Sequence, residues 1–181
     1  MALALSLLLN AILTYNMAHT PDLAAAPTEE PGATSTESES YESGQTYPLM
    51  RVVDGDTITV GFNGHTEYVR LIGLDTPEPN DPGGPECYAS EATTHLRELA
   101  QTGTVILVFD ASQGTRDRYG RLLAYVELPD GTDLATTMIR DGYAHEYTYA
   151  KPYARQAVYR EAENEAVQAE RGLWSPETCT Q

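Results

Sequence analysis

The sequence predicts a small closed β-barrel with helices on one side, an α+β fold that is mainly β, preceded by a disordered N-terminal segment. Three observations predict this arrangement. Five stretches rich in β-forming residues are separated by turn signals, and three other stretches carry apolar residues at helical spacing. Residues 27–46, by contrast, contain no aliphatic residue larger than Ala and could not contribute to a core.

The N-terminal residues have two parts. Residues 2–15 are almost continuously apolar, and about fourteen residues is short for a membrane span but suits the core of a signal peptide. No Lys or Arg precedes this run, which a start site placed too far downstream would explain. We expect residues 1–26 to be a signal peptide or N-terminal membrane anchor and residues 27–46 to be a disordered acidic linker. This order predicts an extracytoplasmic protein, secreted or anchored to the cell envelope, whose folded domain spans residues 47–181.

The first three predicted strands follow one another closely. Residues 50–53 and 57–62 are rich in β-formers and flank an Asp-Gly turn signal. Asn63-Gly64 then predicts a two-residue hairpin leading into a third strand over residues 66–74. A loop rich in Pro and Gly follows, and the spacing of apolar residues predicts a helix over about residues 86–101.

The second half adds two strands and two helices. Residues 104–110 and 122–128 are strongly apolar and predict buried strands. Thr132-Asp133 can cap a short helix over residues 134–140, which Gly142 would end, and Pro152 opens a long helix that continues to residue 170. Three strands, a helix, two strands and two helices fit a five-stranded OB-type barrel with three helices.

The net charge of the chain argues against some classes of function. The chain carries 27 acidic and 11 basic residues, a net charge of −16. Six of the acids precede residue 47, so the domain itself has 21 acids against 11 bases, a charge of −10. Such a domain is unsuited to coating nucleic acid or an anionic membrane, which requires clustered basic residues. The few cations nevertheless gather at Arg116, Arg118 and Arg121 around Tyr119, which predicts a phosphate-binding fork, although a charged hairpin loop is the simpler interpretation of this segment alone.

Two other polar clusters lie at predicted strand ends. Residues 54–57 (DGDT) would, alone, be interpreted as a turn. Residues 70–78 run from an apolar strand into acidic residues, with Arg70 five positions before Asp75. A regular strand would place these two side chains on opposite faces, so a bend, which Gly73 could supply, is required for both to serve one site.

Together these clusters provide what phosphodiester hydrolysis requires. Asp56 and Asp75 offer hard oxygen ligands for Ca²⁺, and the Glu78 carboxylate could orient or deprotonate water. Arginines could neutralise the charge that develops on phosphorus. The four His residues are scattered without the spacing of a zinc site.

The segments VVDGDTITV, VRLIGLDTPE, DRYGRLLAYV and AERGLW, which lie within residues 50–174, resemble the thermonuclease, or staphylococcal nuclease, family of Ca²⁺-dependent secreted nucleases. The resemblance implies an OB-fold barrel with three helices and a Ca²⁺ cofactor. It also implies cleavage of DNA or RNA by in-line attack of water, which gives 3′-phosphorylated products. DNA or RNA is the only partner it suggests, and we expect a monomer.

The resemblance also implies roles for individual residues. The Ca²⁺ ligands would be Asp56, Asp75 and the backbone carbonyl of Thr76, and Glu78 would be the general base. The scissile phosphate would be contacted by Arg70 and Arg121.

The same resemblance implies that Arg118 and Tyr119 bind a terminal phosphate, with Arg118 standing where the family often has Lys. Aligned without a gap, Tyr147 and Tyr149 fall one residue away from the tyrosines of the family's substrate pocket. Because a one-residue slip reverses the face of an extended segment, their contact with the nucleotide is left open, and Tyr147 is retained as a candidate. The loop after Glu78 is acidic and rich in Pro and Gly, whereas the well-known member of the family has several lysines there. We therefore expect this loop to attract the substrate more weakly than the loop of that member does.

Cys87 and Cys179 are the only cysteines. An even count in an exported protein predicts a disulfide that closes a loop of about ninety residues and contributes roughly 2–4 kcal/mol. Two free thiols are the alternative.

Two other functions compete with a nuclease. A non-catalytic OB-fold module that binds nucleic acid would not need the carboxylates Asp56, Asp75 and Glu78. A structural or adhesion domain on a stalk would explain the linker but none of the three polar clusters.

Overall fold

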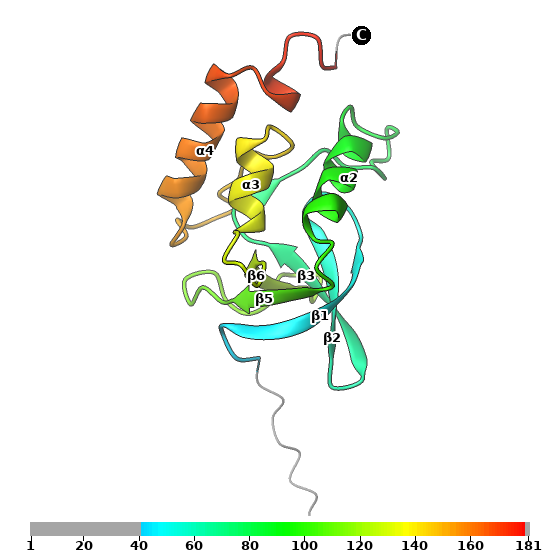
Figure 1. Cartoon of the computed structure of the whole chain (residues 1–181), viewed down its shortest axis with the longest axis vertical. Helices are drawn as coiled ribbons and strands as arrows, with labels where there is room; N and C mark the ends of the chain where they lie inside the picture. Colours follow the sequence, from blue (N-terminus) through cyan, green and yellow to red (C-terminus); the bar gives the residue numbers. More distant parts are fainter. Residues whose placement is uncertain (1–40, 180–181) are drawn as a thin grey trace, which may run out of the picture. The chain divides into compact units, whose positions relative to one another are not determined.

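Five strands close into a barrel in the order β1-β2-β3-β6-β5 in the computed structural model, which describes residues 41–179 (Figure 1). The strands are β1 (Gln45–Val52), β2 (Thr57–Phe62), β3 (His65–Leu71), β5 (Thr104–Val108) and β6 (Leu122–Glu127). The pair β3–β6 is parallel, and the other neighbours in the barrel are antiparallel. The predicted five-stranded OB-type barrel is therefore confirmed. The predicted signal peptide or anchor, and residues 27–40 of the predicted linker, lie outside the described residues.

The barrel begins earlier than the sequence suggested. Residues 41–46 were assigned to the linker, yet β1 starts at Gln45, which pairs with Leu107 of β5. The ring of Tyr41 lies 4.3 Å, centroid to centroid, from that of Phe62. These contacts join residues 41–46 to the domain, because the β5 edge offers hydrogen bonds that the polar composition of the segment does not reveal.

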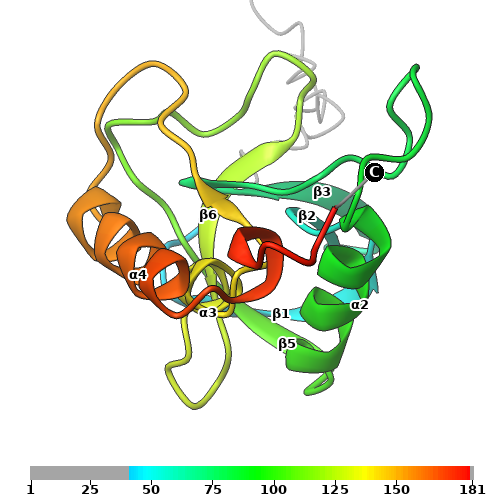
Figure 2. The same ribbon diagram turned by 90° about the horizontal axis from the view of Figure 1, so that it is seen from above.

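Three helices lie on one side of the barrel, as predicted (Figures 1 and 2). They are α2 (Ala89–Leu99), α3 (Leu134–Arg140) and α4 (Gln156–Gln168), and a short 3₁₀ turn, η1 (Gly172–Trp174), follows. Helix α3 has the predicted bounds because its cap is local: the Asp133 carboxylate accepts a hydrogen bond from the Thr136 amide at 3.0 Å. No helix among residues 41–179 is long and apolar enough to cross a membrane.

Helices α2 and α4 begin three or four residues later than predicted. Before α2, Tyr88 has a left-handed backbone (φ 75°), which separates Cys87 from the helix. Before α4, the amide of Ala154 donates to the Asp110 carboxylate at 2.8 Å. The later start of α2 thus follows a local backbone reversal, and that of α4 follows a contact with residue 110, which the local sequence does not show.

The predicted third strand is broken into two. Strand β3 ends at Leu71, and β4 (Leu74–Asp75) leaves the barrel to pair with β7 (His145–Glu146), which the sequence did not predict. Gly73 makes the bend with a φ of +87°, and a Cβ there would lie 2.6 Å from the Tyr153 ring. Only Gly fits this position, and the predicted bend is therefore confirmed.

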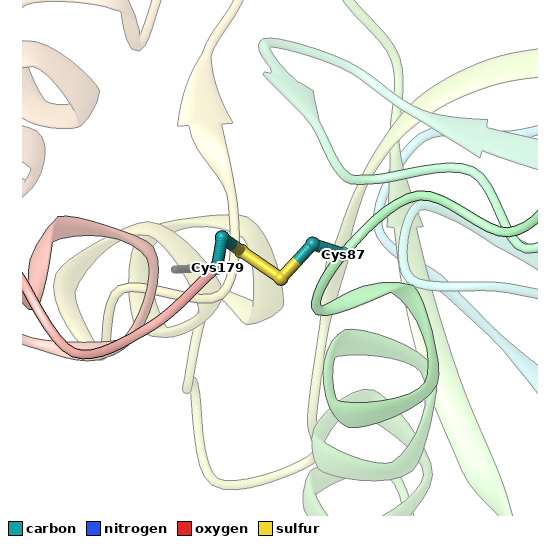
Figure 3. The surroundings of a disulfide bond; sticks show 2 residues. All are labelled: Cys87 and Cys179. Carbon is teal, nitrogen blue, oxygen red and sulfur yellow. A yellow bond between two sulfur atoms is a disulfide. The ribbon is translucent and has the colours of Figure 1, made fainter. Parts of the chain in front are cut away.

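A disulfide joins Cys87 to Cys179, so the alternative of two free thiols is excluded (Figure 3). The bond links residues 92 positions apart, one just before α2 and the other in the segment that follows η1. Both parts lie on the helical side of the domain.

Candidate active site

A cleft of about 540 Å³ opens where the β3–β4 bend meets two loops, residues 112–121 and residues 147–153. Its walls include most of the site residues expected from the sequence: Arg70, Asp75, Glu78, Arg118, Tyr119, Arg121 and Tyr147. Asp56 and Thr76 do not line the cleft and are buried beside it. Residues distant in the chain therefore meet at one place.

Arg70 is the centre of the site. One guanidinium nitrogen, Nη2, lies 2.9 Å from the Asp56 carboxylate and 2.8 Å from that of Asp75. The other, Nη1, donates to the carbonyls of Leu71 and Leu74 at 2.8 Å. Because β3 ends at Leu71, the bend that follows brings Asp75 to the side of Arg70, as the odd spacing of the two residues required.

A second arginine is connected to the same carboxylate. The Thr57 hydroxyl donates to Asp56 Oδ1 at 2.8 Å and accepts from Arg121 Nη1 at 3.3 Å. The Asp117 carboxylate receives the Arg121 side chain at 2.7 Å and the Arg121 amide at 3.0 Å. Sequence reasoning missed Thr57 and Asp117, although both lie inside the motifs it selected.

The mouth of the cleft is aromatic and cationic. Tyr119 is 69% exposed, and its ring is approached by the Arg118 guanidinium at 4.7 Å and by that of Arg121 at 5.5 Å. Tyr147 and Tyr149, 42% and 71% exposed, line the same cleft from another loop. Exposed rings beside guanidinium groups can stack on bases while the arginines bind phosphate.

Arg116 lines the cleft as well, but its guanidinium is bound by more protein groups than those of Arg118 and Arg121. Its guanidinium donates to Glu67 at 2.9 and 3.2 Å, to the Tyr41 hydroxyl at 3.1 Å and to the Gly120 carbonyl at 2.6 Å. Glu67 lies 49 positions away and Tyr41 75 positions away, so no local pattern predicts these two contacts. Arg118 and Arg121 are therefore the less occupied members of the predicted fork.

Two carboxylates of the site, those of Glu78 and Asp75, have raised pKa values. Burial raises the pKa of Glu78 most, and the negative charges of Asp56, Asp54 and Asp75 raise it further. Burial also raises the pKa of Asp75, which the charge of Arg70 only partly counteracts. The site therefore has an excess of negative charge that a bound cation would relieve.

This environment fits the predicted Ca²⁺ ion. Asp56 Oδ2 is buried and accepts no hydrogen bond from residues 41–179, and the Arg70 guanidinium lies 2.9 Å from it. Carboxylate and carbonyl oxygens are the ligands that Ca²⁺ prefers. No group of three or more His, Cys, Asp or Glu side chains within residues 41–179 is placed to hold a metal. The ligands that the resemblance implies are two carboxylates, those of Asp56 and Asp75, and one carbonyl, that of Thr76.

Comparison with known proteins relates the chain to a family of nucleases. Residues 68–176 match the sequence profile of the family described as "Staphylococcal nuclease homologue". The chain is 36% identical over 135 residues to the "Thermonuclease" of Staphylococcus hyicus, which covers 72% of this chain and 76% of that protein. It is 37% identical over 129 residues to the "SPbeta prophage-derived endonuclease YokF" of Bacillus subtilis (strain 168), covering 70% of this chain but only 43% of that protein. An "Uncharacterized endonuclease" of Escherichia coli O157:H7 is 35% identical over 127 residues, which is 70% of this chain and 75% of that protein.

Proposed function

Because the chain belongs to the staphylococcal nuclease family, we propose that it is a Ca²⁺-dependent nuclease that hydrolyses phosphodiester bonds of DNA, RNA or both and leaves 3′-phosphorylated products. One observation carries the proposal. Arg70 and Arg121 are both linked to the Asp56 carboxylate, Arg70 directly and Arg121 through Thr57, and both line the cleft of about 540 Å³.

The two arginines are oriented before substrate arrives. Arg70 is fixed by two carbonyls and two carboxylates, and Arg121 is fixed by Asp117. Charged groups that are held in place beforehand can stabilise the charge of a transition state with little reorganisation. A binding protein would gain affinity from such groups but would not need the adjacent carboxylates.

Glu78 is suited to the role of general base. Its side chain lies at the cleft, and its pKa is raised by burial and by neighbouring aspartates. A raised pKa makes a carboxylate a stronger base toward water, as long as it is ionised at the working pH. Bound Ca²⁺, held by Asp56, Asp75 and the Thr76 carbonyl, would supply positive charge to the phosphate oxygens.

We also propose that the protein acts outside the cytoplasm, secreted or anchored to the envelope through residues 1–26. The Cys87–Cys179 disulfide supports this, because such bonds persist mainly in oxidising compartments. Fractionation of the producing cells, with detection by an antibody to the domain, tests the proposal. Recovery from the cytoplasm alone would contradict it.

The decisive experiment measures cleavage of labelled DNA and RNA by the full chain with Ca²⁺ or with EDTA. We expect cleavage only with Ca²⁺ and products whose 3′ ends carry phosphate. Glu78→Gln and Arg70→Lys should each lower kcat by a factor on the order of 10² or more, because each removes a group that acts in the transition state.

Two exposed residues of α2 supply matched controls, Glu98→Gln and Arg97→Lys, which should cleave like the wild type. Binding of DNA without cleavage under any condition would instead identify a non-catalytic nucleic-acid-binding module. Wild-type rates in both site variants would refute the assignment of the site.

A further inference from the structure

Glu78, the proposed general base, lies at one end of the exposed loop 79–85. Glu86, at the other end, joins the two ends by hydrogen bonds. Residues 79–85 contain three Pro and two Gly and are exposed, apart from the half-buried Pro79. The Glu78 amide donates to the Glu86 carboxylate at 2.7 Å, and the Glu86 amide donates back to the Glu78 carbonyl at 3.0 Å. Glu86 therefore holds both backbone polar groups of Glu78, one with its side chain and one with its main chain.

Glu86 is itself anchored by the residue that follows it. Cys87 forms the disulfide with Cys179, which ties this point of the chain to the segment after η1 (Figure 3). On the other side, the Ala89 amide at the start of α2 donates to the Glu86 carbonyl at 3.2 Å. The loop thus has one fixed end, and Glu78 is connected to it through Glu86.

We propose that Glu86 is a positioning residue for Glu78, and that the Cys87–Cys179 disulfide acts on catalysis through Glu86. This inference rests on the proposed nuclease function. Neither Glu86 nor the disulfide lines the cleft, so neither contacts the substrate phosphate. Their effect is to restrict the position of the Glu78 backbone, and a displacement of about 1 Å at a catalytic group can cost as much as 10²-fold in rate.

A contribution to stability alone does not account for the hydrogen bond between the Glu78 amide and the Glu86 carboxylate. Glu86 is exposed, and an exposed hydrogen bond to a carboxylate contributes little to global stability. The same bond fixes the orientation of the peptide that carries the general base. Loss of Glu86 should therefore lower kcat more than it lowers the free energy of unfolding.

The first test needs no activity. Exchange of the Glu78 amide hydrogen is measured by NMR in the full chain, in Glu86→Ala, in Glu86→Gln and in the double variant Cys87→Ser/Cys179→Ser. We expect about tenfold faster exchange in Glu86→Ala, because the acceptor is lost, and near wild-type exchange in Glu86→Gln, whose amide oxygen still accepts. The double cysteine variant should also exchange faster, and the control Glu98→Ala should not.

The second test separates positioning from folding by kinetics with Ca²⁺ and DNA. Glu86→Ala should lower kcat about tenfold with KM within twofold of wild type, and Glu86→Gln should restore most of the rate. In a Glu78→Gln background, Glu86→Ala should have no further effect, because the base it positions is absent. Dithiothreitol, which becomes a cyclic disulfide as it converts the bond to two thiols, should lower kcat of the wild type but not of the double cysteine variant.

The outcomes distinguish this inference from the proposed function. Unchanged exchange of the Glu78 amide in Glu86→Ala overturns the positioning role, whether or not the chain cleaves DNA. Equal losses of kcat in the wild-type and Glu78→Gln backgrounds also overturn it, since they show a general structural effect. Absence of all cleavage by the wild type would refute the nuclease proposal, and the exchange result would still decide whether Glu86 holds Glu78.

Discussion

Replacing Thr57 by Val tests the connection between the two arginines of the site. Thr57 is 3% exposed, and its hydroxyl joins Asp56 Oδ1 at 2.8 Å to Arg121 Nη1 at 3.3 Å. Val has nearly the same shape but cannot donate or accept. The Asp56 carboxylate, whose Oδ2 already accepts no hydrogen bond, would lose the donor to Oδ1 as well.

The magnitude follows from these contacts. A hydrogen bond to a charged group contributes about 1.5–3 kcal/mol, and its loss in a buried site is not recovered from water. The bond to Arg121 is long and should add little. We therefore expect Thr57→Val to lower the free energy of unfolding by about 1.5–3 kcal/mol.

The effect of Thr57→Val on activity is distinct from its effect on stability. It should be smaller than the effect of removing either arginine. Arg121 remains fixed by Asp117, so we expect kcat/KM with Ca²⁺ and DNA to fall about tenfold, equivalent to about 1.4 kcal/mol. Urea unfolding monitored by the single Trp measures the first quantity, and cleavage of labelled DNA the second. Thr57→Ser, which keeps the hydroxyl, is the control. If Thr57→Val matches the wild type in both assays, the network has no energetic role and the reasoning is refuted.

Three further predictions follow from single features. Gly73→Ala should lower the free energy of unfolding by about 2–5 kcal/mol, because its φ of +87° is strained for any other residue and its Cβ would collide with the Tyr153 ring at 2.6 Å; urea unfolding close to that of the wild type would contradict this. Burial alone would raise the pKa of Asp110, but hydrogen bonds from the Ala154 amide, the Tyr125 hydroxyl and Ser112 hold it at about 2. Because this pKa is below the ordinary value of 3.8, the stability that ionised Asp110 provides is complete above pH 3.8 and is lost as the pH falls toward 2. The difference in unfolding free energy between wild type and Asp110→Asn should therefore shrink over that range in acid titrations, and a difference independent of pH would exclude the effect. Finally, since residues 47–181 carry a charge of −10, cleavage of DNA should hold or increase as salt rises toward 0.15 M, where charges are screened beyond about 8 Å; a steep fall in rate would show that attraction by basic groups dominates.

Local signals account for the elements that the sequence predicted well. Helix α3 has the predicted bounds because an Asp cap begins it and Gly142, with a φ of +81°, follows its end. The bend at Gly73 could be inferred because Arg70 and Asp75 differ by an odd number of residues. Each of these features depends on residues close together in the chain.

The missed features depend on distant contacts. Strand β7 has two residues and exists because β4 pairs with it, and its own sequence has no strand pattern. Arg116 looked available for phosphate but is bound by Glu67 and Tyr41, which come from β3 and from the predicted linker. No local property of these residues indicates that they meet.

The sequence by itself determined the barrel, the family and the chemical types of the site residues. Hydrophobic periodicity, turn residues and short motifs are local patterns, so they can be recognised from residues that are close together in the chain. Only the tertiary structure decided which arginines face the cleft, how Thr57 links them to Asp56, and how Glu86 and the disulfide hold Glu78. The physical reason is that hydrogen-bond partners are set by geometry across the fold. A guanidinium in a strand or loop has the same sequence signature whether it binds phosphate or a buried carboxylate.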